Sequence, residues 1–136
     1  METYYIDSNI LFYAKIMDRE YGEDCARILS LISKGELQAA TSSLAVIELA
    51  NALRKYGLSD QVADVVDAVF SLDFQIIQVD PTDVRNAMEI FDEFRISPYD
   101  CTHVAVMKKA ATNTIVSADR DFEKVTWVRR IDPKTL

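Results

Sequence analysis

The chain alternates between short apolar runs with strand character and longer segments with helical periodicity. We expect strands at residues 4–6, 37–41, 74–79, 115–116 and 128–131. We expect helices at residues 10–16, 23–34, 44–55, 58–72, 82–94 and 101–111. This order predicts an α/β fold with a central parallel sheet flanked by helices on both faces.

Polar residues at the segment boundaries mark the expected helix starts. Ser8 or Asn9 is expected to cap the first helix, Ser42 or Ser43 the third, and Asp100 the helix that follows Pro98. The predicted buried faces include Phe70 in residues 58–72, and Val84 and Met88 in residues 82–94. In residues 58–72, Asp60, Asp64 and Asp67 are expected to form a solvated face.

Three acidic residues lie at the ends of these elements. Asp7 follows the first strand, Asp119 comes just after the strand at 115–116, and Asp100 opens the helix between them. Ligands bind at the carboxyl ends of parallel strands, so these residues are candidates for one site. Asp7 taken alone is better explained as a helix cap, and its position at the strand end is what makes it a candidate.

Glu48 interrupts a helix that is apolar almost all round. Its neighbours three and four residues away are Leu44, Ala45, Asn51 and Ala52, so no cation lies beside it on the helix. A carboxylate in such surroundings is paired, protonated or bound to a metal. A salt bridge to a distant Arg or Lys remains the alternative to metal binding.

Composition is consistent with one domain over residues 1–136. The chain is 49% hydrophobic, with 3 Gly and 3 Pro, and contains no visible linker. No apolar run approaches the roughly 18 residues of a membrane span, and the first residues lack a signal-like block, so we expect a cytoplasmic protein. The spacing of Cys25 and Cys101 predicts two reduced, packed cysteines and no thiolate metal site.

The net charge argues against binding nucleic acid through a broad cationic surface. The chain has 15 basic and 22 acidic residues, for a formal net charge of -7. This objection weakens if several of the acids are concentrated in one metal site. Arg120, Lys124, Lys108 and Lys109 are the candidate phosphate contacts.

Four motifs, in this order, resemble the PIN-domain family and within it the VapC-type toxins of prokaryotic toxin–antitoxin pairs. They are Ile-Asp-Ser-Asn at residues 6–9, Glu-Leu-Ala-Asn-Ala-Leu at 48–53, Pro-Tyr-Asp at 98–100, and Ser-Ala-Asp-Arg-Asp-Phe at 117–122. The resemblance covers essentially the whole chain and implies a single PIN-like domain with a Rossmann-like parallel sheet. It implies a metal-dependent endoribonuclease with RNA as substrate, a homodimer, and a small antitoxin partner.

The resemblance assigns the catalytic and metal-binding roles to Asp7, Glu48, Asp100 and Asp119. It also implies that Asn9 orients Asp7, that Ser117 hydrogen-bonds a carboxylate or water, and that Asp121 is a further candidate. Ligation by oxygen alone suits Mg²⁺ or Mn²⁺. Such an ion can polarise a phosphodiester and activate water for hydrolysis.

Two neighbouring residues need separate interpretation. Strand alternation puts Asp119 on the same side as Ser117, which favours Asp119 as the metal ligand. Asp121 is expected to cap the turn at residues 122–125 by accepting backbone N–H bonds. His103, the only histidine, lies one helical turn after Asp100, but a single histidine on a helix is more often packed or solvated. We therefore leave it out of the predicted site.

Other classes of function remain open at this point. A receiver-like phosphoacceptor domain would have an acidic pair after the first strand and a Lys after a late strand, and the chain has neither. A stand-alone RNA-processing nuclease of the same family and a catalytically silent binding module would share these motifs. Measured RNA cleavage separates the enzymes from the silent module.

Overall fold

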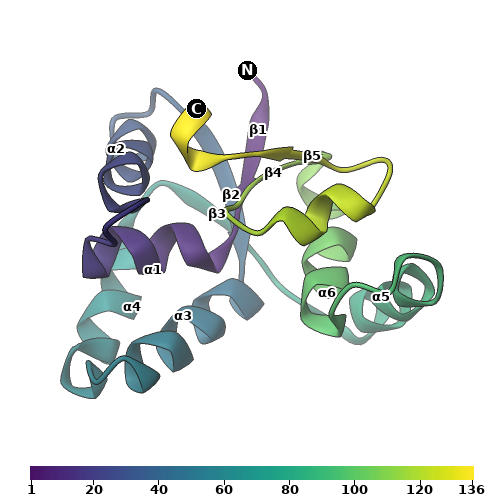
Figure 1. Cartoon of the computed structure of the whole chain (residues 1–136), viewed down its shortest axis with the longest axis horizontal. Helices are drawn as coiled ribbons and strands as arrows, with labels where there is room; N and C mark the ends of the chain where they lie inside the picture. Colours follow the sequence, from purple (N-terminus) through teal and green to yellow (C-terminus); the bar gives the residue numbers. More distant parts are fainter.

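A five-stranded parallel sheet lies at the centre of the structure, a computed structural model that describes all residues from Met1 to Leu136 (Figure 1). Its strand order is β3-β2-β1-β4-β5. The strands are β1 (Thr3–Ile6), β2 (Gln38–Ser42), β3 (Phe74–Ile77), β4 (Thr114–Val116) and β5 (Arg129–Ile131). The predicted α/β class and the parallel sheet are confirmed.

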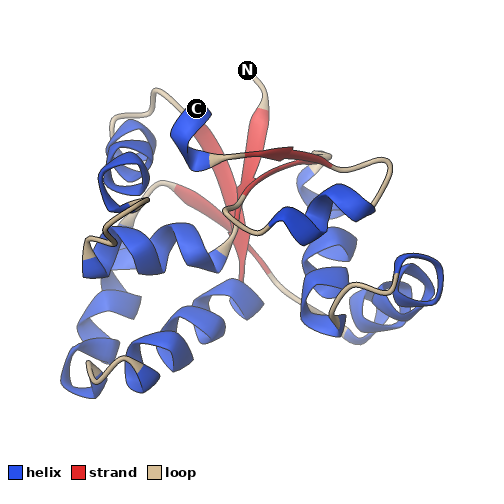
Figure 2. Cartoon of the chain, viewed as in Figure 1, coloured by secondary structure: helices blue, strands red, loops and turns tan.

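Six α-helices connect the strands and cover the sheet (Figure 2). They are α1 (Ser8–Ile16), α2 (Gly22–Ser33), α3 (Ser43–Lys55), α4 (Val62–Ser71), α5 (Pro81–Phe94) and α6 (Pro98–Met107). Short 3₁₀ turns complete the chain at η1 (Ser59–Gln61), η2 (Lys108–Ala110), η3 (Arg120–Lys124) and η4 (Pro133–Thr135). No helix is both long enough and apolar enough to cross a membrane.

The helices form two groups on opposite sides of the sheet, as Figure 1 shows. Helices α5 and α6 pack with η3 around a core that includes Tyr5, Val104 and Phe122. Helices α1 and α2 cover the other face through a cluster that includes Ile6, Ile28 and Val116, and α3 and α4 add a smaller apolar cluster beside it. The chain therefore changes faces after β3.

This change of face brings the ends of β1 and β4 together. The chain runs from β1 outward to β3, crosses the sheet through α5 and α6, and returns to place β4 next to β1. Ile6 pairs with Val116, and the N–H of Asp7 donates to the Val116 carbonyl at 3.1 Å. The segments that follow these two strands therefore meet at the point where the strand order reverses, the usual ligand position in such sheets.

The predicted elements agree with the structure to within a few residues, but several caps are different. Asp7 caps α1 in place of Ser8 or Asn9, because its carboxylate accepts the Ser8 N–H. Ser97 caps α6 by accepting the N–H of Asp100, which puts Asp100 in the first helical turn. Ser42 caps α3, as one of the two predicted alternatives.

Three side chains predicted to face the core are exposed. They are Phe70 at 56%, Val84 at 47% and Met88 at 41%. Helical periodicity marks the apolar stripe of each helix, but it does not show which of those side chains the neighbouring helix covers, α6 for α5 and α3 for α4. The three aspartates of the α4 region are exposed as predicted, and Cys25 and Cys101 are buried free thiols.

Candidate active site

Asp7 is held by donors from two segments far apart in the sequence. It is 5% exposed, and one carboxylate oxygen accepts the Ser8 N–H at 2.7 Å. The other oxygen accepts from the Ser117 hydroxyl at 2.6 Å and from the Asn9 amide at 3.2 Å. Asn9 and Ser117 therefore contact Asp7 directly, and Asp7 caps a helix while also facing the site.

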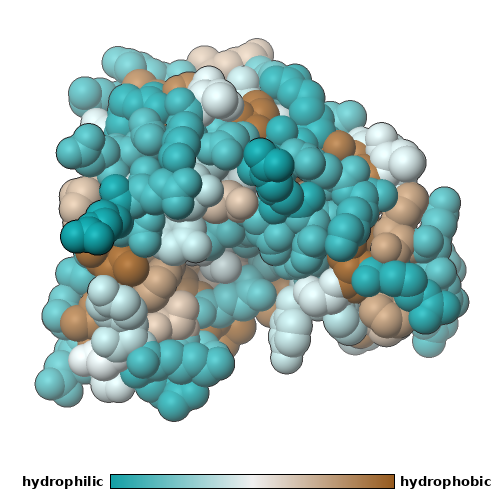
Figure 3. Space-filling model, viewed as in Figure 1, coloured by the Kyte–Doolittle hydropathy of each residue, from teal (hydrophilic) through white to brown (hydrophobic).

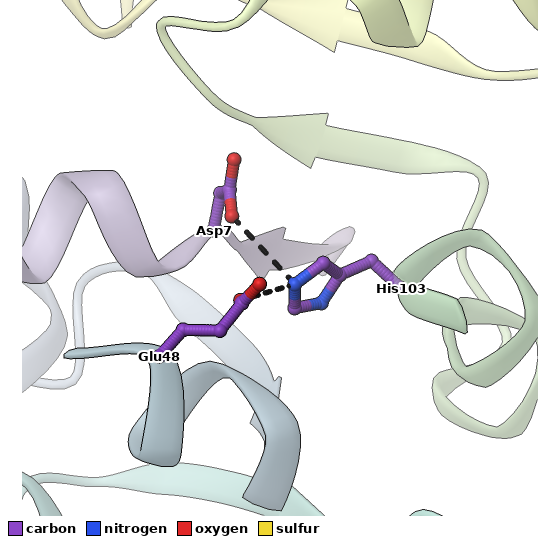
Figure 4. A group of neighbouring side chains, drawn as sticks. All are labelled: Asp7, Glu48 and His103. Carbon is purple, nitrogen blue, oxygen red and sulfur yellow. Dashed lines mark hydrogen bonds and ion pairs between the residues drawn. The ribbon is translucent and has the colours of Figure 1, made fainter. Parts of the chain in front are cut away.

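Glu48 extends from the middle of α3 toward His103 on α6. Its Oε1 lies 2.6 Å from His103 Nε2, and Asp7 Oδ1 lies 4.0 Å from the same nitrogen. Figure 4 shows both carboxylates pointing at one edge of the imidazole ring. The partner of Glu48 is therefore a histidine, where the sequence left only an Arg or Lys salt bridge or a metal as the alternatives.

A second group of carboxylates forms beside the first. Oxygens of Asp100, Asp119 and Asp121 lie within 4.8 Å of one another, and the same limit holds for the ligand atoms of Asp7, Glu48 and His103. The two groups lie close enough that the charges of Asp7, Asp119 and Glu48 all add to the effect of burial in raising the pKa of Asp100. All four predicted acids therefore reach one region.

The structure reverses the capping role expected for Asp121. Asp119 caps η3 by accepting the Asp121 N–H at 2.9 Å, while its own N–H donates to Ser117 Oγ at 3.0 Å. The Asp121 side chain is 51% exposed and pairs with Lys124 at 3.1 Å. The prediction that Asp121 is the cap is wrong, because the residue immediately before the turn takes that position.

Burial, with the charges of neighbouring acids, makes two acids of the site, Asp7 and Asp100, hard to ionise. Burial raises the pKa of Asp100 to about 7, and the charges of Asp7 and Asp119 add to this effect. Burial also raises the pKa of Asp7, although His103 and the Ser117 hydroxyl oppose it. Burial lowers the pKa of His103, but the hydrogen bond to Glu48 and the nearby acids outweigh it, so the pKa is raised.

Lysine and arginine do not neutralise these acids. None of the ion pairs in the protein joins a Lys or Arg to Asp7, Glu48, Asp100 or Asp119. Among the predicted phosphate contacts, Lys109 pairs with Asp80 and Asp83, and Lys124 pairs with Asp121. Lys108 lies over the Trp127 ring, 4.7 Å from its centroid.

Arg120 is the predicted phosphate contact that stays free. It is exposed, forms no ion pair, and follows Asp119 directly in the chain. A free guanidinium at the edge of the acidic region is suited to a phosphate oxygen.

The sequence analysis missed His103 as a member of this region. The histidine is fully buried, and α6 is buried on every side from Cys101 to Met107, so periodicity could not show which way it faces. One signal was available: His103 lies one helical turn from Asp100, on an adjacent part of the helix surface. Tyr5 is a core residue as expected, and its hydroxyl reaches the same imidazole.

A groove leads away from Glu48 along α3. Its lining is mainly apolar with basic residues toward the far end: Leu44, Ile47, Glu48, Ala50, Asn51, Ala52, Arg54, Lys55, Ser59, Val62 and Tyr99. Figure 3 shows the surface hollowed between the side formed by α3 and α4 and the side formed by α5 and α6. Among the four acids Glu48 lines this groove, so a large ligand in the groove can reach the Glu48 carboxylate.

The carboxylate oxygens of this region are suited to bind a hard divalent cation. The four acids supply carboxylate oxygens, the ligands that Mg²⁺ and Mn²⁺ prefer, and they have few cationic partners. Glu48 Oε2, the free Asp119 oxygen and the Asp100 carboxylate accept no hydrogen bond within the protein. A cation here would offset the burial and the repulsion that together raise the pKa of Asp100.

The raised pKa values predict that metal-free protein loses stability as pH rises. Asp7, Asp100 and His103 bind protons more tightly when folded, so the native state holds more protons and stability falls as pH passes through the folded pKa values. For Asp100 this window runs from 3.8 to about 7. Melting temperatures in EDTA should fall across it, and Asp100→Asn should flatten the slope. Parallel curves for wild type and variant would contradict the assignment.

Comparison with known proteins identifies the family. Residues 4–128 match the PIN domain. Ribonuclease VapC13 of Mycobacterium tuberculosis is 22% identical over 127 residues, covering 93% of this chain and 97% of that protein, and a VapC ribonuclease of Mycobacterium bovis matches equally.

Solved structures share the fold at low identity. Mycobacterium tuberculosis VapC20, a Sarcin-Ricin loop cleaving toxin, superposes with a TM-score of 0.77 at 16% identity, covering 93% of this chain and 97% of that one. VapBC2 from Rickettsia felis, bound to a promoter DNA fragment, gives a TM-score of 0.72 at 19% identity, covering 96% and 98%. With the family matched over nearly its whole length and the acidic motifs brought to one edge of the sheet, the chain belongs to the PIN-domain family.

Proposed function

We propose that this protein is a Mg²⁺- or Mn²⁺-dependent endoribonuclease that acts as the toxin of a toxin–antitoxin pair. The observation that carries the proposal is the convergence of Asp7, Glu48, Asp100 and Asp119 with almost no cationic partners. The relatives support the choice of RNA as substrate, because those matched over nearly the whole chain are named as VapC ribonucleases. We place the activity in the cytoplasm.

In this proposal the four carboxylates hold the cation, and neighbouring groups fix their positions. Asn9 and Ser117 orient Asp7, and backbone N–H groups orient Asp7 and Asp119. A bound Mg²⁺ or Mn²⁺ would polarise the phosphodiester and lower the pKa of the attacking water. Arg120 offers a contact for a flanking phosphate, and the groove beside Glu48 accommodates the strand.

The antitoxin is proposed from the solved relatives and from the shape of this groove. Several matching structures are toxin–antitoxin complexes, including VapBC from Salmonella typhimurium and a complex from Klebsiella pneumoniae. The apolar wall formed by Leu44, Ile47 and Tyr99 ends at the Glu48 carboxylate. A peptide with apolar side chains and one basic residue would fill the wall and neutralise the acids, which would block RNA.

An exposed apolar surface supports the homodimer. Ile47, Val84 and Tyr99 line one shallow depression, and Met88 lies one turn from Val84 on α5. Their exposures are 64%, 47%, 64% and 41% for Ile47, Val84, Tyr99 and Met88. Large exposed apolar side chains that gather in this way are typical of protein contacts. Since Ile47 and Tyr99 adjoin Glu48 and Asp100, a dimer on this surface would place both active sites along its seam.

The first test is metal dependence. Wild-type protein should cleave RNA endonucleolytically with Mg²⁺ or Mn²⁺ and stop in EDTA, because the carboxylates act through the cation. Asp7→Asn, Glu48→Gln and Asp100→Asn should each lower the cleavage rate by about 100-fold or more, the loss typical when one group that stabilises developing charge is removed. Their metal-free melting temperatures should stay level or rise, because repulsion is relieved.

Asp67→Asn is the matched control for these variants, since Asp67 is exposed on α4, outside both acidic groups. It should cleave like wild type. Cleavage that persists in chelator would refute the metal mechanism, and absence of RNA cleavage under all metal conditions would favour a silent binding module.

Asp119 and Asp121 are expected to differ in their effect on cleavage. Asp119→Asn should abolish activity, while an asparagine oxygen still accepts the Asp121 N–H and keeps η3 folded. Asp121→Asn should retain much of the activity, because that side chain is half-exposed and paired with Lys124. Cleavage rates and melting temperatures of both variants decide the matter. A folded, inactive Asp121 variant beside an active Asp119 variant would reverse the assignment.

The apolar surface predicts a dimer that one charge disrupts. Wild type should be dimeric by light scattering at micromolar concentration, and Val84→Glu should make it monomeric, because a charge buried in such a contact has no partner. Phe70→Glu is the matched control: Phe70 is 56% exposed on α4, away from this surface. The surface is misassigned if Phe70→Glu separates the protomers and Val84→Glu leaves them together.

A further inference from the structure

His103 lies in the middle of a hydrogen-bonded series of side chains that joins four elements of the fold, β1, β2, α3 and α6. Tyr5 Oη lies 2.8 Å from Ser42 Oγ and 2.7 Å from His103 Nδ1, and His103 Nε2 lies 2.6 Å from Glu48 Oε1. Tyr5, Ser42 and His103 are fully buried. Because both ring nitrogens are engaged and the Tyr5 ring packs edge-on at 5.7 Å, the imidazole has one fixed orientation.

This series of hydrogen bonds starts at the N-cap of α3 and returns to the middle of the same helix. Ser42 caps α3 by accepting the Ala45 N–H at 3.2 Å, and Glu48 lies further along α3. Tyr5 comes from the central strand β1 and His103 from α6 on the opposite face of the sheet. The side chains of His103 and Tyr5 therefore fix the Glu48 carboxylate relative to the sheet, in addition to the support from its own helix.

Glu48 needs such support more than Asp7 and Asp119 do. Asp7 and Asp119 each accept a backbone N–H at a helix start, where these donors have no partner within the helix. Glu48 lies inside α3, where the N–H groups are already bonded along the helix. Its long side chain is 26% exposed, so only a side-chain donor can hold it in place.

Two arrangements of the protons on Ser42, Tyr5 and His103 satisfy all of these hydrogen bonds, and in both of them His103 can donate to Glu48. With a neutral ring, Ser42 donates to Tyr5, Tyr5 donates to Nδ1, and Nε2 carries the ring proton. With a charged ring, Nδ1 donates to Tyr5, Tyr5 donates to Ser42, and Nε2 is again protonated. In either case the N–H of Nε2 donates to Glu48 Oε1 and leaves Oε2 free.

We propose that His103 is a positioning residue of the metal site, which holds the Glu48 carboxylate facing Asp7 and is itself held by Tyr5 and Ser42. This inference rests on the proposed metal-dependent function. Histidine-to-carboxylate bonds that orient a ligand are a recurring feature of metal sites, and their loss typically weakens metal binding by about 10- to 100-fold. In this proposal His103 contacts the metal-binding residue Glu48 and does not contact the RNA.

Calorimetric titration with Mn²⁺ alone tests the positioning role of His103 in a matched pair of variants. In His103→Gln the amide nitrogen reaches the position of Nε2, so Mn²⁺ affinity should stay within about threefold of wild type. In His103→Asn the amide reaches only the position of Nδ1, so affinity should fall by about 10- to 100-fold. Tyr5→Phe removes one hydroxyl and keeps the ring, and should weaken Mn²⁺ binding without changing the KM for RNA.

Melting curves in EDTA separate positioning from folding. A purely structural histidine would make the Gln and Asn variants lose thermal stability together, with equal Mn²⁺ affinity once folded, and that result would overturn the proposal. If His103→Asn does not fold, wild-type Mn²⁺ affinity in Tyr5→Phe would overturn it instead.

Glu48→Gln shows which proposal fails. In one outcome, wild type binds Mn²⁺ with an affinity that Glu48→Gln weakens and that the His103 and Tyr5 variants leave unchanged. That result would refute only the positioning role. If wild type binds no Mn²⁺ or Glu48→Gln has no effect, the metal site is refuted, and the role of His103 with it.

Discussion

Carboxylates that share a pocket repel one another, and the active-site region of this protein depends on how that repulsion is offset. Two like charges 4 Å apart cost about 4 kcal/mol at an effective dielectric constant of 20. Burial raises the pKa of Asp7 and of Asp100, and the charges of neighbouring acids add to this effect. A divalent cation between these carboxylates would offset both the burial and the repulsion.

The ends of helical segments supply much of the relief that exists. Asp7 caps α1, Asp119 caps η3, and Asp100 lies in the first turn of α6. Each of these acids is near backbone N–H groups that have no partner within the helix, and near the positive end of the helix dipole. The strand order makes this possible, because it brings the loops after β1 and β4 to the start of α6.

The sequence predicted the elements, and three of the four proposed site acids stand out in it because each follows or interrupts an apolar segment. Asp7 and Asp119 follow apolar strands, and Glu48 interrupts an apolar helix. The order of the elements was enough to infer that strand ends meet at one edge. Caps were harder to predict, since neighbouring polar residues compete for the same N–H groups, and Asp119 took the position expected for Asp121.

His103 and the exposed apolar residues were missed for different physical reasons. Helix α6 is buried all round, so its pattern carries no information about which neighbour the histidine meets. Val84 and Met88 have the spacing of a core stripe, yet they lie beside the buried stripe of α5, which is formed by Asp83, Ala87 and Ile90. A pattern that serves a contact between chains resembles one that serves a core.

The register of β1 links the core to the site. Tyr5 pairs with Ala40 on one side and Ile115 on the other, which points its ring toward α6, while Ile6 faces α1 and α2. Successive strand residues face opposite sides, so a slip of one residue would turn Tyr5 away from His103 and move Asp7 from the strand end. The same pairing that buries the core therefore sets the distance between the Asp7 carboxylate and the imidazole that holds Glu48.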